Sequence, residues 1–237
     1  SKEIFSSLLA QTLLALVLGI LVAITAHYFV EGARYLLSLR DVQVLTLNVG
    51  NQNYSVVPIV FMLISAALII VVRRSLGVTK WSGPADSIYA LHQPKVGVDV
   101  RIGIGSTIAA FISAGGGASV GQYGPLVHFG ATLATIISKL SGKYIRKDVL
   151  IACGAAAAIS SGFGAPIAGI IFAHEALLRR FSIGGLAPIS VASIVAAATN
   201  RYLFDVNLTF QVPSSDLDLV AVLPFVIIFA PICSGIA

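Results

Sequence analysis

The amino-acid sequence predicts an all-α membrane protein that crosses the bilayer several times. Hydrophobic residues make up 57% of the 237 residues and charged residues only 11%, against roughly 25% charged residues in soluble domains. This composition excludes a disordered chain, a nucleic-acid-binding domain and an ordinary soluble enzyme. Six segments lack Asp, Glu, Lys and Arg altogether: Ile4–Val30, Val42–Val72, Ile102–Ser138, Val149–His174, Phe181–Asn200 and Leu219–Ala237.

Three apolar runs predict single transmembrane helices. About 20 mostly apolar residues cross a bilayer, and Ile4–Val30 is long enough for one tilted helix. No small-residue cleavage site followed by a soluble domain is present, so this run is interpreted as a membrane anchor rather than a signal peptide. Val56–Val72, with Pro58 near its start, predicts the second helix, and Ser182–Tyr202 predicts another.

Glycine and proline predict broken helices in the third and fourth segments. Gly115-Gly116-Gly117 and Gly124-Pro125 divide the third segment, and Phe163-Gly164-Ala165-Pro166 divides the fourth. Non-helical backbone is costly in hydrocarbon unless it faces protein or water, so interrupted helices indicate a solute pathway near the bilayer centre. For Gly103, Gly105 and Gly169, the preferred interpretation is not a solute pathway but close packing of helices, which small residues allow.

The basic residues predict the orientation of the chain. Twelve of the 15 Lys and Arg residues can be placed on one side, which is expected to be the cytoplasmic side of the inner cell membrane. Lys139–Asp148 is then a cytoplasmic loop, Arg40–Tyr54 is external, and Trp81–Leu91 is a short re-entrant helix. The twelve are Lys2, Arg73, Arg74, Lys80, Lys95, Arg101, Lys139, Lys143, Arg146, Lys147, Arg179 and Arg180.

Two segments predict anion binding at the start of a helix. In the first, Ser82 is a plausible N-cap, Pro84 suits the first turn and Asp86 suits the positive helix end. Exposed N–H groups there, together with a hydroxyl group, can hold an anion, although simple capping is an alternative interpretation. The second is the glycine-rich segment 115–130, in which Pro125 starts a helix whose N-terminus lies within the membrane and attracts anions.

The second segment resembles the CLC family of chloride channels and proton/chloride exchangers. The external-gate signature of that family is Gly-(Lys/Arg)-Glu-Gly-Pro, and this chain has Gly121-Gln122-Tyr123-Gly124-Pro125. The resemblance extends to the runs 153–158 and 164–172. Ser82-Gly83 resembles the anion motif Gly-Ser-Gly-Ile-Pro, with Trp81 in place of the first glycine and the proline one position early. The resemblance implies anion binding by Ser82, Gly83, Gly121, Gln122, Tyr123 and Gly124.

The resemblance implies a fold of two inverted repeats of tilted, broken and re-entrant helices, assembled as a homodimer with one pore per subunit. Residues 1–210 correspond to the first repeat, and residues 211–237 to a loop and the first helix of an incomplete second repeat. The second anion motif and the late ion-coordinating tyrosine of the family are absent from the 237 residues. The second half of the pore is therefore expected from missing sequence or from another chain.

Tyr123 stands at the position of the gating glutamate of the exchangers. A carboxyl group titrates near 4.3 and a phenol near 10, so Tyr123 cannot carry protons as the glutamate does. It can still plug the pore or donate its hydroxyl to an anion, and packing at a membrane interface is the alternative. The expected function is passive, uncoupled chloride conduction. The alternatives are a proton/chloride exchanger with a rearranged proton path and a non-conducting membrane scaffold subunit.

The family's internal proton-relay position aligns with Ala176, and Glu175 lies immediately before it. A shift of one residue would restore the relay at Glu175. His174 and Glu175, beside Arg179 and Arg180, are otherwise interpreted as a solvated helix end or a salt-bridge cluster. In members of the family, a serine at the position of Ser82 is associated with a preference for chloride over other anions. No enzyme activity, metal or cofactor is expected, and chloride is the substrate.

Overall fold

The computed structural model describes residues 2–40, 46–49, 52–93, 97–141 and 146–205, and the single positions 224, 227 and 229. The chain divides into two units, Ser1–Asn207 and Leu208–Ala237. The second unit is described only at Pro224, Ile227 and Phe229, each of which is helical. Apart from these three positions, the loop and helix predicted for 211–237 lie outside the described residues.

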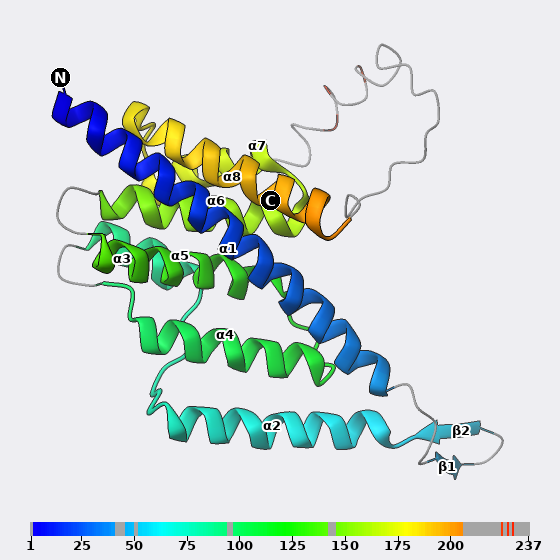
Figure 1. The fold of residues 1–237 in the computed structure, drawn as a ribbon. Helices are drawn as coiled ribbons and strands as arrows, with labels where there is room; N and C mark the ends of the chain where they lie inside the picture. The colour runs from blue at the N-terminus through cyan, green and yellow to red at the C-terminus, as the bar shows by residue number, and fades with distance from the viewer. Residues whose placement is uncertain are drawn as a thin grey trace. The chain divides into compact units, whose positions relative to one another are not determined.

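The first unit is helical, which confirms the predicted fold class (Figure 1). A small antiparallel hairpin within the predicted external loop interrupts the helices, with Val49 opposite Gln52. The elements in chain order are α1 (Lys2–Arg40), β1 (Thr46–Val49), β2 (Gln52–Ser55), α2 (Val57–Ser75), α3 (Pro84–His92), α4 (Val100–Gly115), α5 (Tyr123–Leu140), α6 (Lys147–Phe163), α7 (Pro166–Phe172), the π-helix η1 (Ala173–Leu178) and α8 (Ile183–Leu203).

Three of the described helices, α1, α2 and α8, are long and apolar enough to cross a membrane. With 39 residues, α1 is longer than its apolar run predicted. At 1.5 Å per residue it measures about 58 Å, whereas the hydrocarbon core is about 30 Å thick. It must therefore tilt or extend beyond the hydrocarbon, and Figure 1 shows it running obliquely across the other helices.

The two predicted helix breaks are confirmed, and each contains a glycine in the left-handed region. Helix α4 ends at Gly115, and Gly117 has a φ of 94° before α5 begins. Helix α6 ends at Phe163, Gly164 has a φ of 64°, and Pro166 starts α7. Only glycine adopts such backbone angles without steric cost, so these residues fix where the helices stop. Helix α3 has nine residues, about 14 Å, a length consistent with the predicted re-entrant helix.

Helix α6 is the centre of the unit and packs against α1, α5, α7 and α8. Its run from Cys153 to Ala158 is fully buried. At the crossing with α5, a Cβ atom on Gly154 would collide with the Gly130 carbonyl group, so the two backbones are in direct contact. A Cβ atom on Gly169 would lie 2.6 Å from the Ala156 carbonyl oxygen. These small residues allow the close helix packing that was inferred for Gly169.

The basic segments meet at one end of the helical unit. The Arg180 Nη2 atom lies 2.9 Å from Asp148 Oδ2 at the start of α6. A Cβ atom on Gly97 would lie 3.5 Å from Lys147 Nζ, and one on Gly77 would lie 3.5 Å from an Arg101 guanidinium nitrogen. The end of α2 and the starts of α4, α6 and α8 are therefore neighbours, as the positive-inside distribution predicts.

Candidate anion-binding site

The structure brings the two predicted anion-binding segments together. Helix α3 packs against α5, and their first turns touch, because a Cβ atom on Gly124 would lie 3.7 Å from Pro84 Cγ. Around these turns there is open space, since a Cβ atom on Gly83 or on Gly121 would meet no atom within 4 Å. Two helix N-termini, each with a partial positive charge, thus lie close together, with open space beside Gly83 and Gly121.

The start of α3 is already partly occupied by its own side chains. The helix begins at Pro84 with Gly83 as N-cap, so the prediction of Ser82 as N-cap is wrong by one residue. The reason is Asp86, whose Oδ2 atom accepts the Gly83 N–H at 2.8 Å. The Ser82 N–H donates to Ser106 Oγ at 2.9 Å. What Ser82 can still offer an anion is its hydroxyl group, which has no partner among the described residues.

The start of α5 has free donors. Its N-cap, Gln122, makes no capping hydrogen bond with its side chain, and its first turn contains no acidic residue. The backbone N–H groups of Gly121, Gln122, Tyr123 and Gly124 have no hydrogen-bond acceptor within the described part of the chain. A helix end with unpaired N–H groups and a net positive dipole binds anions. Of the two segments, α5 therefore has the greater capacity for an anion.

The Tyr123 ring lies on the last turn of α6. Its ring centroid is 4.3 Å from that of Phe163, and a Cβ atom on Gly162 would lie 2.5 Å from Tyr123 Cδ1. The side chain is partly buried, and its hydroxyl group has no partner among the described residues. The aromatic pair thus connects the free N-terminus of α5 to the helix break at Gly164. The ring occupies space directly beside the free N–H groups.

A buried hydrogen bond that the sequence did not predict connects α3 to α5. Ser87 Oγ lies 2.6 Å from His128 Nδ1, and the two residues are 0% and 3% exposed. The other ring nitrogen of His128, Nε2, is buried and has no partner among the described residues. His128 was interpreted as an isolated packed or interfacial residue. The signal that could have identified the pair is its position, because each residue lies about one turn after the start of its helix.

The predicted internal proton-path residues lie on η1. Glu175 is exposed and has no ion pair in the described part of the chain, whereas Ala176 is partly buried. His174 Nδ1 lies 3.0 Å from the Ile170 carbonyl oxygen, and its ring stacks on Phe181 at 5.1 Å. Glu175 is therefore exposed at the end of the helix, as the first of the two interpretations expects. The predicted salt-bridge cluster does not include it.

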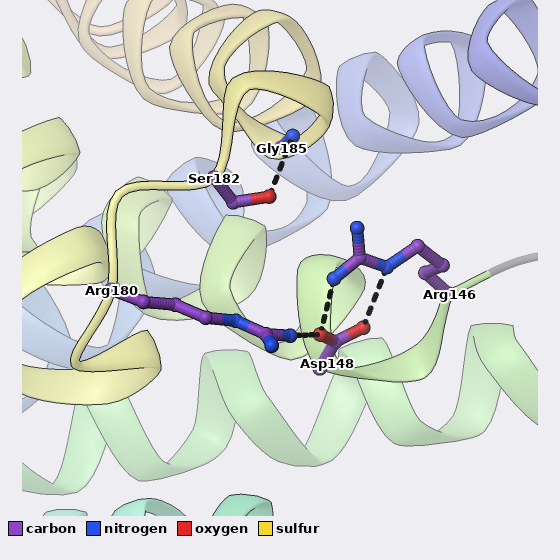
Figure 2. Close-up of polar contacts among 5 residues, drawn as sticks. All are labelled: Arg146, Asp148, Arg180, Ser182 and Gly185. Atoms are coloured by element: carbon purple, nitrogen blue, oxygen red, sulfur yellow. Dashed lines mark hydrogen bonds and ion pairs between the residues drawn. The ribbon is translucent and has the colours of Figure 1, made fainter.

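The salt-bridge cluster forms instead around Asp148 (Figure 2). Its Oδ2 atom lies 2.7 Å from Arg146 Nη2 and 2.9 Å from Arg180 Nη2. Burial raises the pKa of Asp148, but the hydrogen bonds and charges of the two arginines outweigh this effect and hold the pKa below its usual value. Because the carboxylate is ionised at neutral pH, it ties the start of α6 to the segment that precedes α8.

Comparisons with known proteins identify the family and the fold. Residues 75–237 match the family model of the voltage gated chloride channel. The chain is 33% identical over 150 residues to the chloride channel protein CLC-f of Arabidopsis thaliana, covering 60% of this chain and 19% of that protein. It is also 33% identical over 99 residues to the human H(+)/Cl(-) exchange transporter 5, covering 40% of this chain and 12% of that protein.

A solved structure shares the fold. The crystal structure of a CLC-type fluoride/proton antiporter superimposes with a TM-score of 0.73 and 24% identity, covering 93% of this chain and 54% of that one. The chain therefore spans about half the length of the structural relative and about a fifth of the plant relative. With a family match over more than half of the residues, the chain belongs to the voltage-gated chloride channel family.

Proposed function

We propose that the protein forms part of a passive chloride pathway through the membrane and does not couple chloride to protons. The observation that carries this proposal is the phenol of Tyr123, which stands at the gating position of the family signature beside the free N–H groups of α5. A phenol is a much weaker acid than the carboxyl group of a glutamate. It therefore cannot deliver the proton that an exchanger binds and releases in each cycle.

The proposed anion site consists of the α5 N–H groups from Gly121 to Gly124 and the hydroxyl group of Ser82. Backbone donors at a helix N-terminus stabilise an anion through both their hydrogen bonds and the helix dipole. Gly83 contributes room rather than a donor, since its N–H is bonded to Asp86. Ser82, with its free hydroxyl group, is proposed to favour chloride.

The rest of the pathway is proposed to come from residues outside this chain. This chain covers 54% of the solved relative, and the second repeat would come from the same gene product or from another chain. We further propose a homodimer in the inner cell membrane, with the basic end of the helical unit in the cytoplasm. The proposed activity requires no cofactor, metal or enzymatic step.

Reconstituted flux tests the proposal directly. The gene product is placed in liposomes with equal chloride on both sides and a pH gradient across the membrane. We expect chloride flux that follows the membrane potential, with no chloride accumulation driven by protons. Chloride accumulation in response to the pH gradient would establish an exchanger, for which exposed Glu175 is the candidate internal proton group. Absence of flux through correctly folded protein would instead support a non-conducting scaffold.

Substitution at Ser82 tests the anion site. The variant Ser82→Ala removes the hydroxyl group and keeps the N–H that donates to Ser106. A hydrogen bond to a charged group contributes about 1.5–3 kcal/mol. If its loss affects chloride more than nitrate by about 1 kcal/mol, the chloride-to-nitrate permeability ratio should fall about fivefold. The variant Ser82→Pro should change the ratio further, because it also removes the N–H. An unchanged ratio in both variants would show that this segment does not contact the anion.

A further inference from the structure

A second candidate site for an anion lies away from the starts of α3 and α5, and its polar walls are mostly basic. A cavity of about 310 Å³ opens between the end of α3, the start of α6 and the segment that joins η1 to α8. Its apolar walls are leucines of α3 and η1, and its polar walls are His92, Asp148, Arg179 and Arg180. We propose that this cavity binds the phosphate group of an anionic phospholipid. This inference concerns the lipid contacts of the protein and does not depend on its mode of transport.

The charges around the cavity are unbalanced. The carboxylate of Asp148 is shared by Arg146 and Arg180, as Figure 2 shows. Arg179 adds a third guanidinium group, which has no ion pair within the described residues. The residues that line the cavity thus carry two guanidinium groups against one carboxylate, an excess of one positive charge, and Arg146 beside Asp148 adds another. A guanidinium group has five N–H donors, so Arg180 still has donors available after its bond to Asp148. Phosphate oxygens are well suited to such donors.

The backbone that presents the arginines is unusual. Arg179 has a φ of 51° and a ψ of 27°, a left-handed conformation that is costly for a residue other than glycine. It follows directly on the π-helix η1, and π-helical turns occur frequently at functional sites. A glycine would adopt this turn with less strain, yet the sequence has an arginine there. Strain of this kind indicates that the side chain has a function at this position.

The apolar surroundings favour a membrane lipid over a soluble phosphate compound. Phe181 and Ile183, which follow the two arginines, are 71% and 84% exposed. Exposed apolar side chains next to basic ones are typical of segments at the membrane surface, where the apolar groups enter the acyl region and the basic groups contact the phosphates. The cavity also lies at the end of the unit where the basic segments gather, close to the start of α6.

A lipid titration with matched variants tests the proposal. Short-chain phosphatidylglycerol, phosphatidylcholine or inorganic phosphate is added to the purified gene product in detergent, and the rise in Tm is measured. We expect phosphatidylglycerol to raise the Tm of the wild-type protein, and its apparent affinity to fall about fivefold in Arg179→Gln, the loss expected for one basic residue. Arg179→Lys preserves the charge and should preserve most of the affinity.

The control is Arg74→Gln, which removes the same charge at the same end of the unit. Arg74 is exposed in the last turn of α2 and does not line the cavity, so this variant should bind phosphatidylglycerol as the wild type does. Equal affinity in Arg179→Gln and wild type would overturn the site. An equal effect of inorganic phosphate would overturn the lipid as ligand, and an equal effect of phosphatidylcholine would overturn the requirement for an anionic headgroup.

Discussion

Replacing Tyr123 with alanine is expected to raise chloride flux about tenfold, which corresponds to a barrier lower by about 1.4 kcal/mol. The ring packs on Phe163 and Gly162 beside the unpaired N–H groups at the start of α5. Alanine removes the ring and leaves these N–H groups in place, so an anion gains space without losing its donors. The measurement is chloride efflux from liposomes, normalised to the amount of reconstituted protein.

Two further variants separate the contributions of the Tyr123 ring and its hydroxyl group. Tyr123→Phe keeps the ring and removes the hydroxyl group, so flux should stay near the wild-type rate if the ring is what obstructs the path. Tyr123→Glu introduces a group that titrates near 4.3, and its flux should be slow at neutral pH and increase as the carboxylate is protonated. Wild-type rates in Tyr123→Ala would contradict an obstructing ring.

Replacing Gly154 with valine is expected to prevent stable folding. A Cβ atom at this position would lie 2.5 Å from the Gly130 carbonyl carbon and closer still to its oxygen. Both atoms belong to the backbone of α5, so they cannot move aside unless α5 separates from α6 at the centre of the unit. Overpacking costs 1–3 kcal/mol where side chains can adjust, and here we expect about 3 kcal/mol or more.

Gly184→Ala provides the matched control for the Gly154 variant. Gly184 lies in the first turn of α8. The atom nearest to a Cβ atom added there would be an Arg146 guanidinium nitrogen, at 4.0 Å. This variant should be as stable as the wild type or slightly more stable, because alanine is the better helix former. The measurement is the fraction of monodisperse protein after heating in detergent. A Gly154→Val variant as heat-resistant as the control would show that the α5–α6 contact tolerates a side chain.

The sequence predicted the features of this fold that depend on local backbone chemistry. The breaks at Gly115–Gly117 and Gly164 were predicted because glycine acts on its own backbone angles and proline on its own and those of the preceding residue. The apolar segments predicted the helices, since length and hydropathy suffice for that purpose. The family signature led to Tyr123 as the residue beside the free donors of α5, although its role in transport stays a prediction.

The features that the sequence did not predict depend on contacts between distant residues. Ser87 and His128 are separated by 41 positions, and their similar positions near two helix starts identify them as partners only once those helices are known to lie side by side. Asp148 was expected in a basic loop beside Arg146, but its second partner, Arg180, becomes apparent only when the start of α6 meets the segment before α8. The π-helix η1 likewise follows an ordinary apolar helical pattern and differs from it only in its hydrogen bonds.

The Ser87–His128 hydrogen bond restricts how such a pathway can open. Because the bond is short and buried, a sliding motion of α3 or α5 alone would break it and leave two buried polar groups unpaired, at a cost of about 1–3 kcal/mol for each group. The two helix starts are therefore expected to move together as one rigid frame. If the proposed chloride pathway passes these helix starts, rotation of the Tyr123 side chain would open it without breaking this hydrogen bond.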